Sequence, residues 1–139
     1  TISRTISTCG FFIAMNKLLW LRLIGISGAV CVMLGAFATH GLETRLTERH
    51  MAIFQTAVFY QFLHTLALFG LVCLPDQLVN PKIRDWAAIS FALGIFIFSG
   101  SLYLLVVTQI GALGMITPIG GSAFIIGWLL LIFVVKRAQ

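Results

Sequence analysis

The stretch from Phe98 to Trp128 constrains the fold most, because it is long, apolar and free of charge. It leaves one apolar segment, crosses a glycine-rich turn, and enters a second apolar segment through Thr117 and Pro118. Roughly 20 apolar residues cross the hydrocarbon core of a bilayer, and an exposed loop is rarely so apolar. The stretch therefore predicts two membrane helices joined by a short turn.

Composition extends this prediction to the whole chain. The 139 residues are 60% hydrophobic and only 9% charged, whereas a soluble domain has about 25% charged residues. The net charge of +5 comes from basic residues scattered in ones and twos, without the basic stripe that grips nucleic acid. We therefore expect membrane lipids as partners, with the basic excess setting topology and attracting anionic headgroups.

Charged and glycine- or proline-bearing breaks divide the chain into an all-α, integral membrane four-helix bundle. The predicted spans cover about 18–40, 48–74, 86–107 and 118–135. Gly41 is predicted to end the first helix, and Thr47 to cap the second. Residues 75–85 read as a solvent-exposed loop. Thr117 is predicted to cap the fourth helix, with Pro118 in its first turn and Lys136 and Arg137 at its end.

Residues 1–14 look unlike the rest, and Met15 begins an ordinary bacterial start. We interpret residues 1–14 as an N-terminal extension that is either not native or else disordered. We interpret residues 15–139 as a single transmembrane domain. An organelle transit peptide is a weaker alternative for this segment, and a leader cleaved after Ala38 is another.

Lys and Arg residues predict the orientation. Seven fall on the side of the two termini and the second loop, against two, Arg45 and Arg49, on the other side. By the positive-inside rule, both termini are expected to be cytoplasmic. The expected location is the bacterial inner membrane, crossed several times.

The second predicted helix is the most polar of the four. Its first polar residue after the charged start is Gln55, and five more follow. At about 100° per residue, Thr56, Tyr60 and His64 form one row, and Gln61 and Thr65 form an adjacent row. Unsatisfied polar groups in lipid cost several kcal/mol, so both rows should face the protein interior. The side facing lipid should carry the large apolar residues Phe59, Phe62, Leu66 and Phe69.

Small residues predict the helix-packing faces, because they let helices approach closely in membranes. In the first helix they recur at or beside every fourth position, and the third helix adds Gly94. The predicted packing residues are Ser27, Gly28, Cys31, Gly35 and Gly94.

Four motifs resemble those of the YgdD-like family, an uncharacterised family of small bacterial inner-membrane proteins. They are Gly35–Leu42, Tyr60–Ala67, Phe98–Tyr103, and Thr117–Gly121 followed by Gly127 and Trp128. Ala38 and Thr39 depart slightly from the family's usual first motif. The resemblance covers about Met15 to Arg137, and it implies four membrane helices with no established activity.

Histidines are the candidates for chemistry, because an ionisable group within a span suggests function. The candidate functional polar cluster comprises His40, Tyr60, Gln61, His64, Ser99, Ser101 and Tyr103. Neutral imidazoles that bond neighbouring helices are the simpler interpretation. The turn motif Thr117, Pro118, Gly120 and Gly121 predicts a tight turn with close packing, with anion binding at the helix N-terminus as the alternative. No catalytic residue, metal ligand set or cofactor is predicted, and the three cysteines lack the spacing of a zinc site or disulfide framework.

The best-supported function is an accessory, assembly or packing role in the inner membrane, as a homo-oligomer or within a larger complex. A solute or proton transporter with a polar path along the second helix is the first alternative. A membrane enzyme that acts on a lipid or quinone with His40 and His64 is the second. The absence of carboxylates within the spans weakens the transporter.

Overall fold

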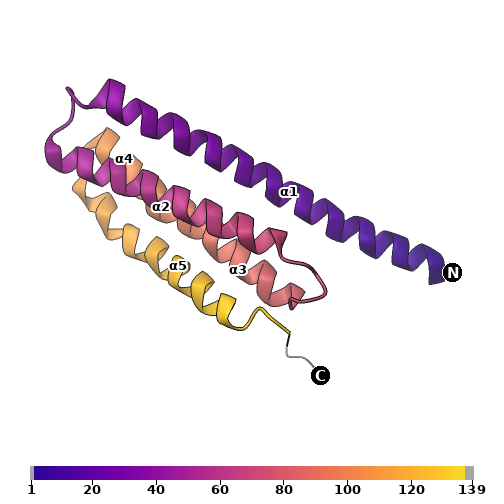
Figure 1. Cartoon of the computed structure of the whole chain (residues 1–139). Helices are drawn as coiled ribbons and strands as arrows, with labels where there is room; N and C mark the ends of the chain where they lie inside the picture. Colours follow the sequence, from indigo (N-terminus) through magenta and orange to yellow (C-terminus); the bar gives the residue numbers. More distant parts are fainter. Residues whose placement is uncertain (1, 137–139) are drawn as a thin grey trace.

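The computed structural model describes residues 2–136, with side chains from Lys17 onward. Four helical segments are long and apolar enough to cross a membrane: Lys17–Leu42, Glu48–Cys73, Pro81–Thr108 and Gly111–Ile132. The predicted all-α fold with four spans is therefore confirmed. The elements in chain order are α1 (Ile2–Phe37), η1 (Ala38–Leu42), α2 (Glu48–Cys73), α3 (Pro81–Gly94), η2 (Ile95–Ser99), α4 (Gly100–Thr108), η3 (Gly111–Met115) and α5 (Thr117–Ile132) (Figure 1).

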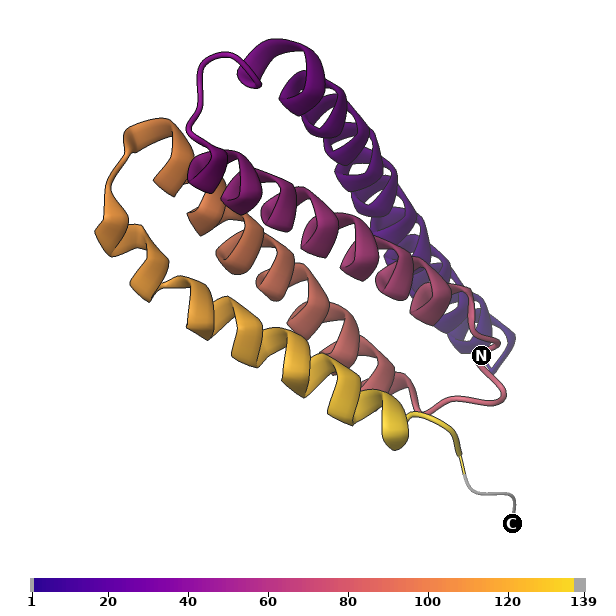
Figure 2. The same ribbon diagram turned by 60° about the vertical axis from the view of Figure 1, so that its left-hand side comes forward.

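The helices follow one another side by side rather than closing around a central axis (Figures 1 and 2). Helix α1 packs on α2, α2 packs on the α3–η2–α4 span, and α5 packs mainly on α3 and η2. The two middle spans are accordingly more buried than the outer two. The outer helices leave broad apolar faces, which a bilayer would cover.

The first span, Lys17–Leu42, lies close to the predicted 18–40, but the helix that contains it is longer and ends differently. Helix α1 begins at Ile2, so it also includes residues of the segment predicted as an extension. Gly41 does not cap it, because Gly41 lies inside the π-helical turn η1 and has no left-handed backbone. The ring of Phe37 lies over Gly41 at 2.6 Å from where a Cβ would be. The close packing of this ring, rather than a turn, accounts for the glycine.

The predicted start of the second helix is confirmed. The Thr47 side chain accepts a hydrogen bond from the backbone N–H of His50 at 3.3 Å, and α2 begins at Glu48. Further along α2, Phe59, Phe62, Leu66 and Phe69 are exposed as predicted. These side chains form part of the surface that faces lipid.

The third span begins at Pro81 rather than near Trp86, so residues 81–85 are not loop as predicted. The Asn80 side chain accepts hydrogen bonds from the backbone N–H groups of Lys82 and Ile83, at 3.1 and 3.4 Å. Pro81 occupies the first turn, where its missing N–H is not needed. An Asn–Pro pair at the cap and first position thus starts the helix despite the charges that follow.

The fourth span begins earlier and ends earlier than predicted. A 3₁₀ helix, η3, leads into α5, and the residue at the cap position is Ile116 with no side-chain cap bond, so Thr117 is not the cap. Helix α5 ends at Ile132, because the chain then pairs with the second loop. The Asn80 N–H donates to Val134 O, and the Lys136 N–H donates to Leu78 O, both at 2.8 Å. The predicted stop at Lys136 is therefore wrong, and Arg137 lies outside the described residues.

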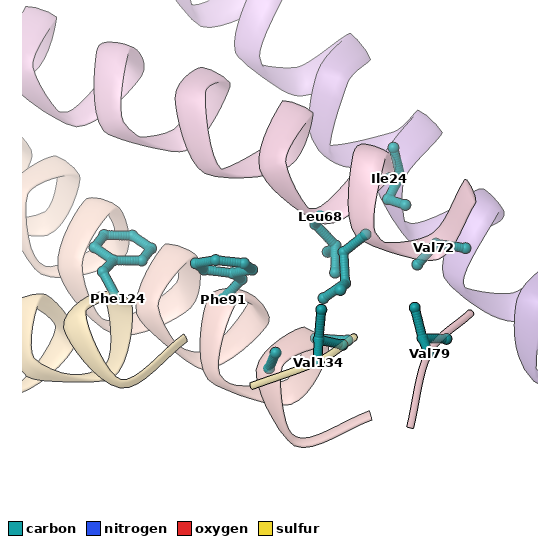
Figure 3. Close-up of a cluster of buried hydrophobic side chains, with 10 residues drawn as sticks. Ile24, Leu68, Val72, Val79, Phe91, Phe124 and Val134 are labelled. Carbon is teal, nitrogen blue, oxygen red and sulfur yellow. The ribbon is translucent and has the colours of Figure 1, made fainter. Parts of the chain in front are cut away.

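Two clusters of buried apolar side chains form the core. The larger one lies towards the second loop and brings together Ile24, Leu68, Val72, Val79, Phe91, Phe124 and Val134 (Figure 3). The smaller one lies towards the first loop and contains Ala38, Phe54, Leu105 and Val106. Residues from all four spans thus hold the helices together at the second-loop end.

Glycines and phenylalanines interlock between the third span and α5. A Cβ on Gly127 would lie 2.7 Å from the ring of Phe91, and one on Gly94 would collide with the ring of Phe124. A Cβ on Gly120 would collide with the backbone of Phe98. The prediction that Gly94 is a packing residue agrees with this seam, in which each glycine makes room for a large neighbour.

Candidate functional site

His64 lies buried on α2, with only 3% of its surface exposed, and both ring nitrogens have partners. The indole N–H of Trp128 donates to His64 Nε2 at 3.2 Å. Since Nε2 accepts, the proton of a neutral ring must lie on Nδ1, which donates to the carbonyl oxygen of Tyr60 at 2.8 Å. The geometry therefore fits a neutral imidazole that ties α2 to α5, with no nitrogen left for a ligand.

Aromatic rings enclose this histidine. The ring of Phe124 stacks on the imidazole with a centroid separation of 3.5 Å, and Phe91 and Trp128 approach it at 5.8 and 6.1 Å. The sequence indicates Trp128 only as a residue of a family motif, because a partner 64 positions away leaves no local signal. A groove of about 430 Å³ runs along this site, lined in part by Tyr60, His64, Ser122 and Trp128.

Gln61 is the centre of a separate polar group on the other side of α2. Its Nε2 donates to Ser27 O on α1 at 3.1 Å, and Tyr103 Oη on α4 donates to its Oε1 at 2.8 Å. The hydroxyls of Ser27 and Thr65 bond each other at 2.7 Å. The amide thus links three spans, and its two ends serve as donor and acceptor in different directions.

The two serines of the predicted cluster make different contacts. Ser99, 1% exposed at the end of the π-helical turn η2, donates to Ala57 O on α2 at 2.9 Å. Ser101 bonds Thr117 Oγ1 at 2.8 Å. The Thr117 hydroxyl therefore joins α4 to α5 across the turn, and the close approach of Gly120 to Phe98 favours the packing interpretation of this motif.

The two candidate histidines are not brought together. His40 lies exposed at the end of the first span. His64 lies further along the bundle, because its neighbours on α2, Gln61 and Thr65, bond Ser27 on α1. His40 lies thirteen positions after Ser27, which corresponds to about 20 Å along a helix. Among residues 17–136 no group of three or more His, Cys, Asp or Glu side chains is placed to hold a metal ion.

The predicted packing residues of α1 divide into two sets. Ser27 bonds Thr65, Cys31 Sγ donates to Val58 O at 3.2 Å, and a Cβ on Gly35 would meet Val58 at an ordinary 3.7 Å. Gly28 has no neighbour within 4 Å of a Cβ, so it does not pack on α2. Thr56 also departs from its predicted inward row, since it is exposed and donates to Ala52 O at 2.8 Å in its own helix.

A charged cluster at the second loop was not predicted. Asp76 pairs with Lys17 at 3.1 Å and with Arg84, and Arg84 also pairs with Asp85 at 3.2 Å. Partial burial raises the pKa of Asp76, but hydrogen bonds and positive charge from Lys17 and Arg84 outweigh this and hold it below its ordinary value. The cluster places the start of the first span beside the second loop, where the chain after α5 also returns.

Comparison with known proteins finds relatives of similar length. Residues 34–121 match a family model described as a protein of unknown function, DUF423. A UPF0382 membrane protein of Staphylococcus haemolyticus is 45% identical over 81% of this chain and 93% of its own length. The UPF0382 membrane protein YwdK of Bacillus subtilis is 43% identical over 77% of this chain and 87% of its own.

The UPF0382 inner membrane protein YgdD of Escherichia coli is 36% identical over 85% of this chain and 89% of its own length. The resemblance read from four motifs is therefore confirmed. These names and the four spans together also confirm the expected location, a multi-pass protein of the bacterial inner membrane. No solved structure matches the chain.

Proposed function

Because this chain belongs to the UPF0382 (DUF423) family of membrane proteins, we propose that it is an accessory or assembly protein of the inner membrane. It would act through contacts with copies of itself or with other membrane proteins. The observation that supports this most is the state of its interior. Within residues 17–136, no buried side-chain nitrogen or oxygen lacks a hydrogen-bond partner.

The way in which these hydrogen bonds are grouped argues against a transporter. The residues of the expected polar path fall into separate groups: Gln61 with Ser27 and Tyr103, His64 with Trp128, and Ser101 with Thr117. A relay needs groups that exchange protons or ions along a continuous line, and proton relays commonly use Asp, Glu or His. These polar groups instead resemble hydrogen-bonded links between helices.

An enzyme that uses both histidines has less support. His64 has no free nitrogen for a substrate, and His40 lies about 20 Å along the helix direction from its level. A general base must come within hydrogen-bond reach of its proton. The groove beside His64 is therefore better explained as a lipid-facing surface than as a reaction site.

The proposed orientation places both termini in the cytoplasm. The start of the first span, the second loop and the chain after α5 share one side, where Lys17 and Lys136 lie beside residues 76–78. That side carries most of the Lys and Arg residues, and positive residues are retained on the cytoplasmic side. Labelling of single cysteines by an impermeant reagent in oriented vesicles tests the proposal.

His64→Ala distinguishes the proposed role from transport. Loss of the ring would leave a cavity and two unpaired partners, and we expect a loss of about 2–4 kcal/mol in unfolding free energy. Proton and ion flux in proteoliposomes should equal that of empty vesicles before and after the change. Copurification in mild detergent, followed by mass spectrometry, should recover self-association or a stoichiometric protein partner. Reproducible flux that His64→Ala abolishes at unchanged stability would replace this proposal with transport.

A further inference from the structure

A groove of about 330 Å³ lies between α1 and α2 on the outer surface of the first two spans. Val32, Gly35 and Thr39 line it from α1, and Gln55 and Phe59 line it from α2. Val32 is 67% exposed and Phe59 is 60% exposed. The groove is therefore open towards the bilayer, and its walls are apolar except for a few polar groups.

The amide of Gln55 is the unusual group in this groove. Gln55 is exposed and makes no side-chain hydrogen bond to residues 17–136, unlike Gln61 six residues further along. It lies six residues beyond Arg49, which corresponds to about 9 Å along the helix from the last charged residue. An amide at this position faces hydrocarbon, where an unsatisfied polar group costs several kcal/mol.

Four exposed hydroxyl side chains in the spans avoid this cost within their own helix. Thr39, Thr56, Thr108 and Ser122 each donate to the carbonyl oxygen four residues earlier, at 3.0, 2.8, 2.6 and 2.9 Å. Short hydroxyl side chains can reach that carbonyl. The amide of Gln55 makes no such bond among residues 17–136, so both its donor and its acceptor are free to bond a group from outside them.

We propose that two copies of this chain pair through the α1–α2 groove, with the two Gln55 amides bonded to each other across a two-fold axis. An amide carries both a donor and an acceptor, so two glutamines related by symmetry can satisfy each other reciprocally. Both copies insert in the same orientation, so the axis runs along the membrane normal and equivalent residues meet. Gly35, which lines the groove from α1, has no side chain to obstruct the approach of the second copy. The inference rests on the proposed assembly role and specifies its partner.

Disulfide cross-linking in membrane vesicles tests the interface. In a background carrying Cys9→Ala, Cys31→Ser and Cys73→Ala, Phe59→Cys places a thiol one turn beyond Gln55 on the groove. The serine keeps a donor for Val58 O. We expect the Phe59→Cys chain to form a disulfide dimer under mild oxidation, and the added change Gln55→Leu to reduce the yield. The matched control is Ser122→Cys, an exposed position on α5 away from this groove, which should give no dimer.

The dimer dissociation constant in vesicles, measured by single-molecule photobleaching of the wild-type chain, gives the size of the effect. Interhelical hydrogen bonds in membranes are worth about 0.6–1.7 kcal/mol each, and Gln55→Leu in both copies removes two of them, so it should raise the dissociation constant by about 8- to 300-fold. Ser122→Ala, which removes a hydroxyl already satisfied in its own helix, should leave it unchanged.

Two results would overturn the pairing: a wild-type chain that stays monomeric in vesicles, or a dimer whose dissociation constant Gln55→Leu does not change. Neither result alone removes the assembly role, since a monomer that copurifies with another membrane protein in stoichiometric amount would retain it. A monomer that has no protein partner would overturn both. Thermal unfolding of each variant shows whether a loss of dimer reflects a loss of fold.

Discussion

The third span and α5 contact each other in a different way from α1 and α2. The former pair interlocks by shape, with Gly94, Gly120 and Gly127 each receiving part of a phenylalanine. The latter pair uses hydrogen bonds of Ser27, Cys31 and Gln61, while Gly35 meets its neighbour only at an ordinary distance.

The comparison shows that two kinds of contact hold different pairs of helices together in one membrane protein. Lipid tails are as apolar as leucine side chains, so burial alone does not drive membrane helices together. Close shape complementarity supplies dispersion contacts at α5, whereas polar bonds hold α1 and fix its register. The groove with Gln55 lies on the α1–α2 side.

The largest difference between the two sides should come from adding one methyl group to a glycine. Gly120→Ala would push a Cβ into the backbone of Phe98, which cannot rotate away, and overpacking costs about 1–3 kcal/mol. Gly35→Ala would meet Val58 at 3.7 Å and should change stability by less than about 0.5 kcal/mol. Unfolding free energies in mixed micelles measure both.

Gly100→Ala is the control for this pair, because Gly100 lies within a span and has open space around its Cβ. Replacing a helical glycine by alanine without strain should stabilise by about 0.4–1 kcal/mol. Equal losses at Gly120 and Gly35 would contradict the distinction between the two contacts.

The polar contacts of Gln61 reach α4 as well as α1, and their strength can be measured through Gln61 and Tyr103. Tyr103→Phe and Gln61→Leu each remove one end of a 2.8 Å hydrogen bond between spans. A double-mutant cycle on unfolding free energy should give a coupling of about 0.6–1.7 kcal/mol, the range of interhelical bonds in membranes. The pair Tyr103→Phe with Ser122→Ala, whose side chains share no hydrogen bond, should couple by less than about 0.5 kcal/mol. A coupling near zero for the bonded pair would mean that packing, rather than this hydrogen bond, holds α2 to α4.

The sequence predicts the four spans and their outward faces because both depend on local properties. Lengths of apolar chain decide the spans, and the large residues opposite the polar rows, such as Phe59 and Phe69, face outward as expected. The Thr47 cap is equally local. The Asn80–Pro81 start also had a local signal, but the surrounding charges favoured a loop and concealed it.

Contacts between distant residues account for what the sequence could not predict. The end of α5 depends on pairing with residues 78–80, far away in the chain. The partner of His64 is a tryptophan on another span. Periodicity placed Tyr60, Gln61 and His64 on one side of a helix, but it could not show that Gln61 and His64 face different neighbours. The residues predicted as one polar cluster therefore lie in several separate hydrogen-bonded groups.

The smallest expected effect concerns the ion pairs that join the start of the first span to the second loop. Asp76→Asn should lower the unfolding free energy at neutral pH by up to about 1 kcal/mol, since the carboxylate is partly exposed. The folded pKa of Asp76 lies below the unfolded value of about 3.9. Its contribution is therefore present above that unfolded pKa and disappears as pH falls through the folded pKa.

A pH series of unfolding measurements on both chains checks this last prediction. The wild-type and Asp76→Asn curves should differ at neutral pH and converge in strong acid. Glu43→Gln is the control, because Glu43 is an exposed loop carboxylate with no ion pair to residues 17–136, and its curve should follow the wild type. The Gly120→Ala loss should persist at every pH, since no charge contributes to that contact. If the loss of unfolding free energy caused by Gly120→Ala varied with pH in the same way as the loss caused by Asp76→Asn, the glycine contact would depend on charge. That result would contradict the distinction between packing at α5 and ion pairing at the second loop.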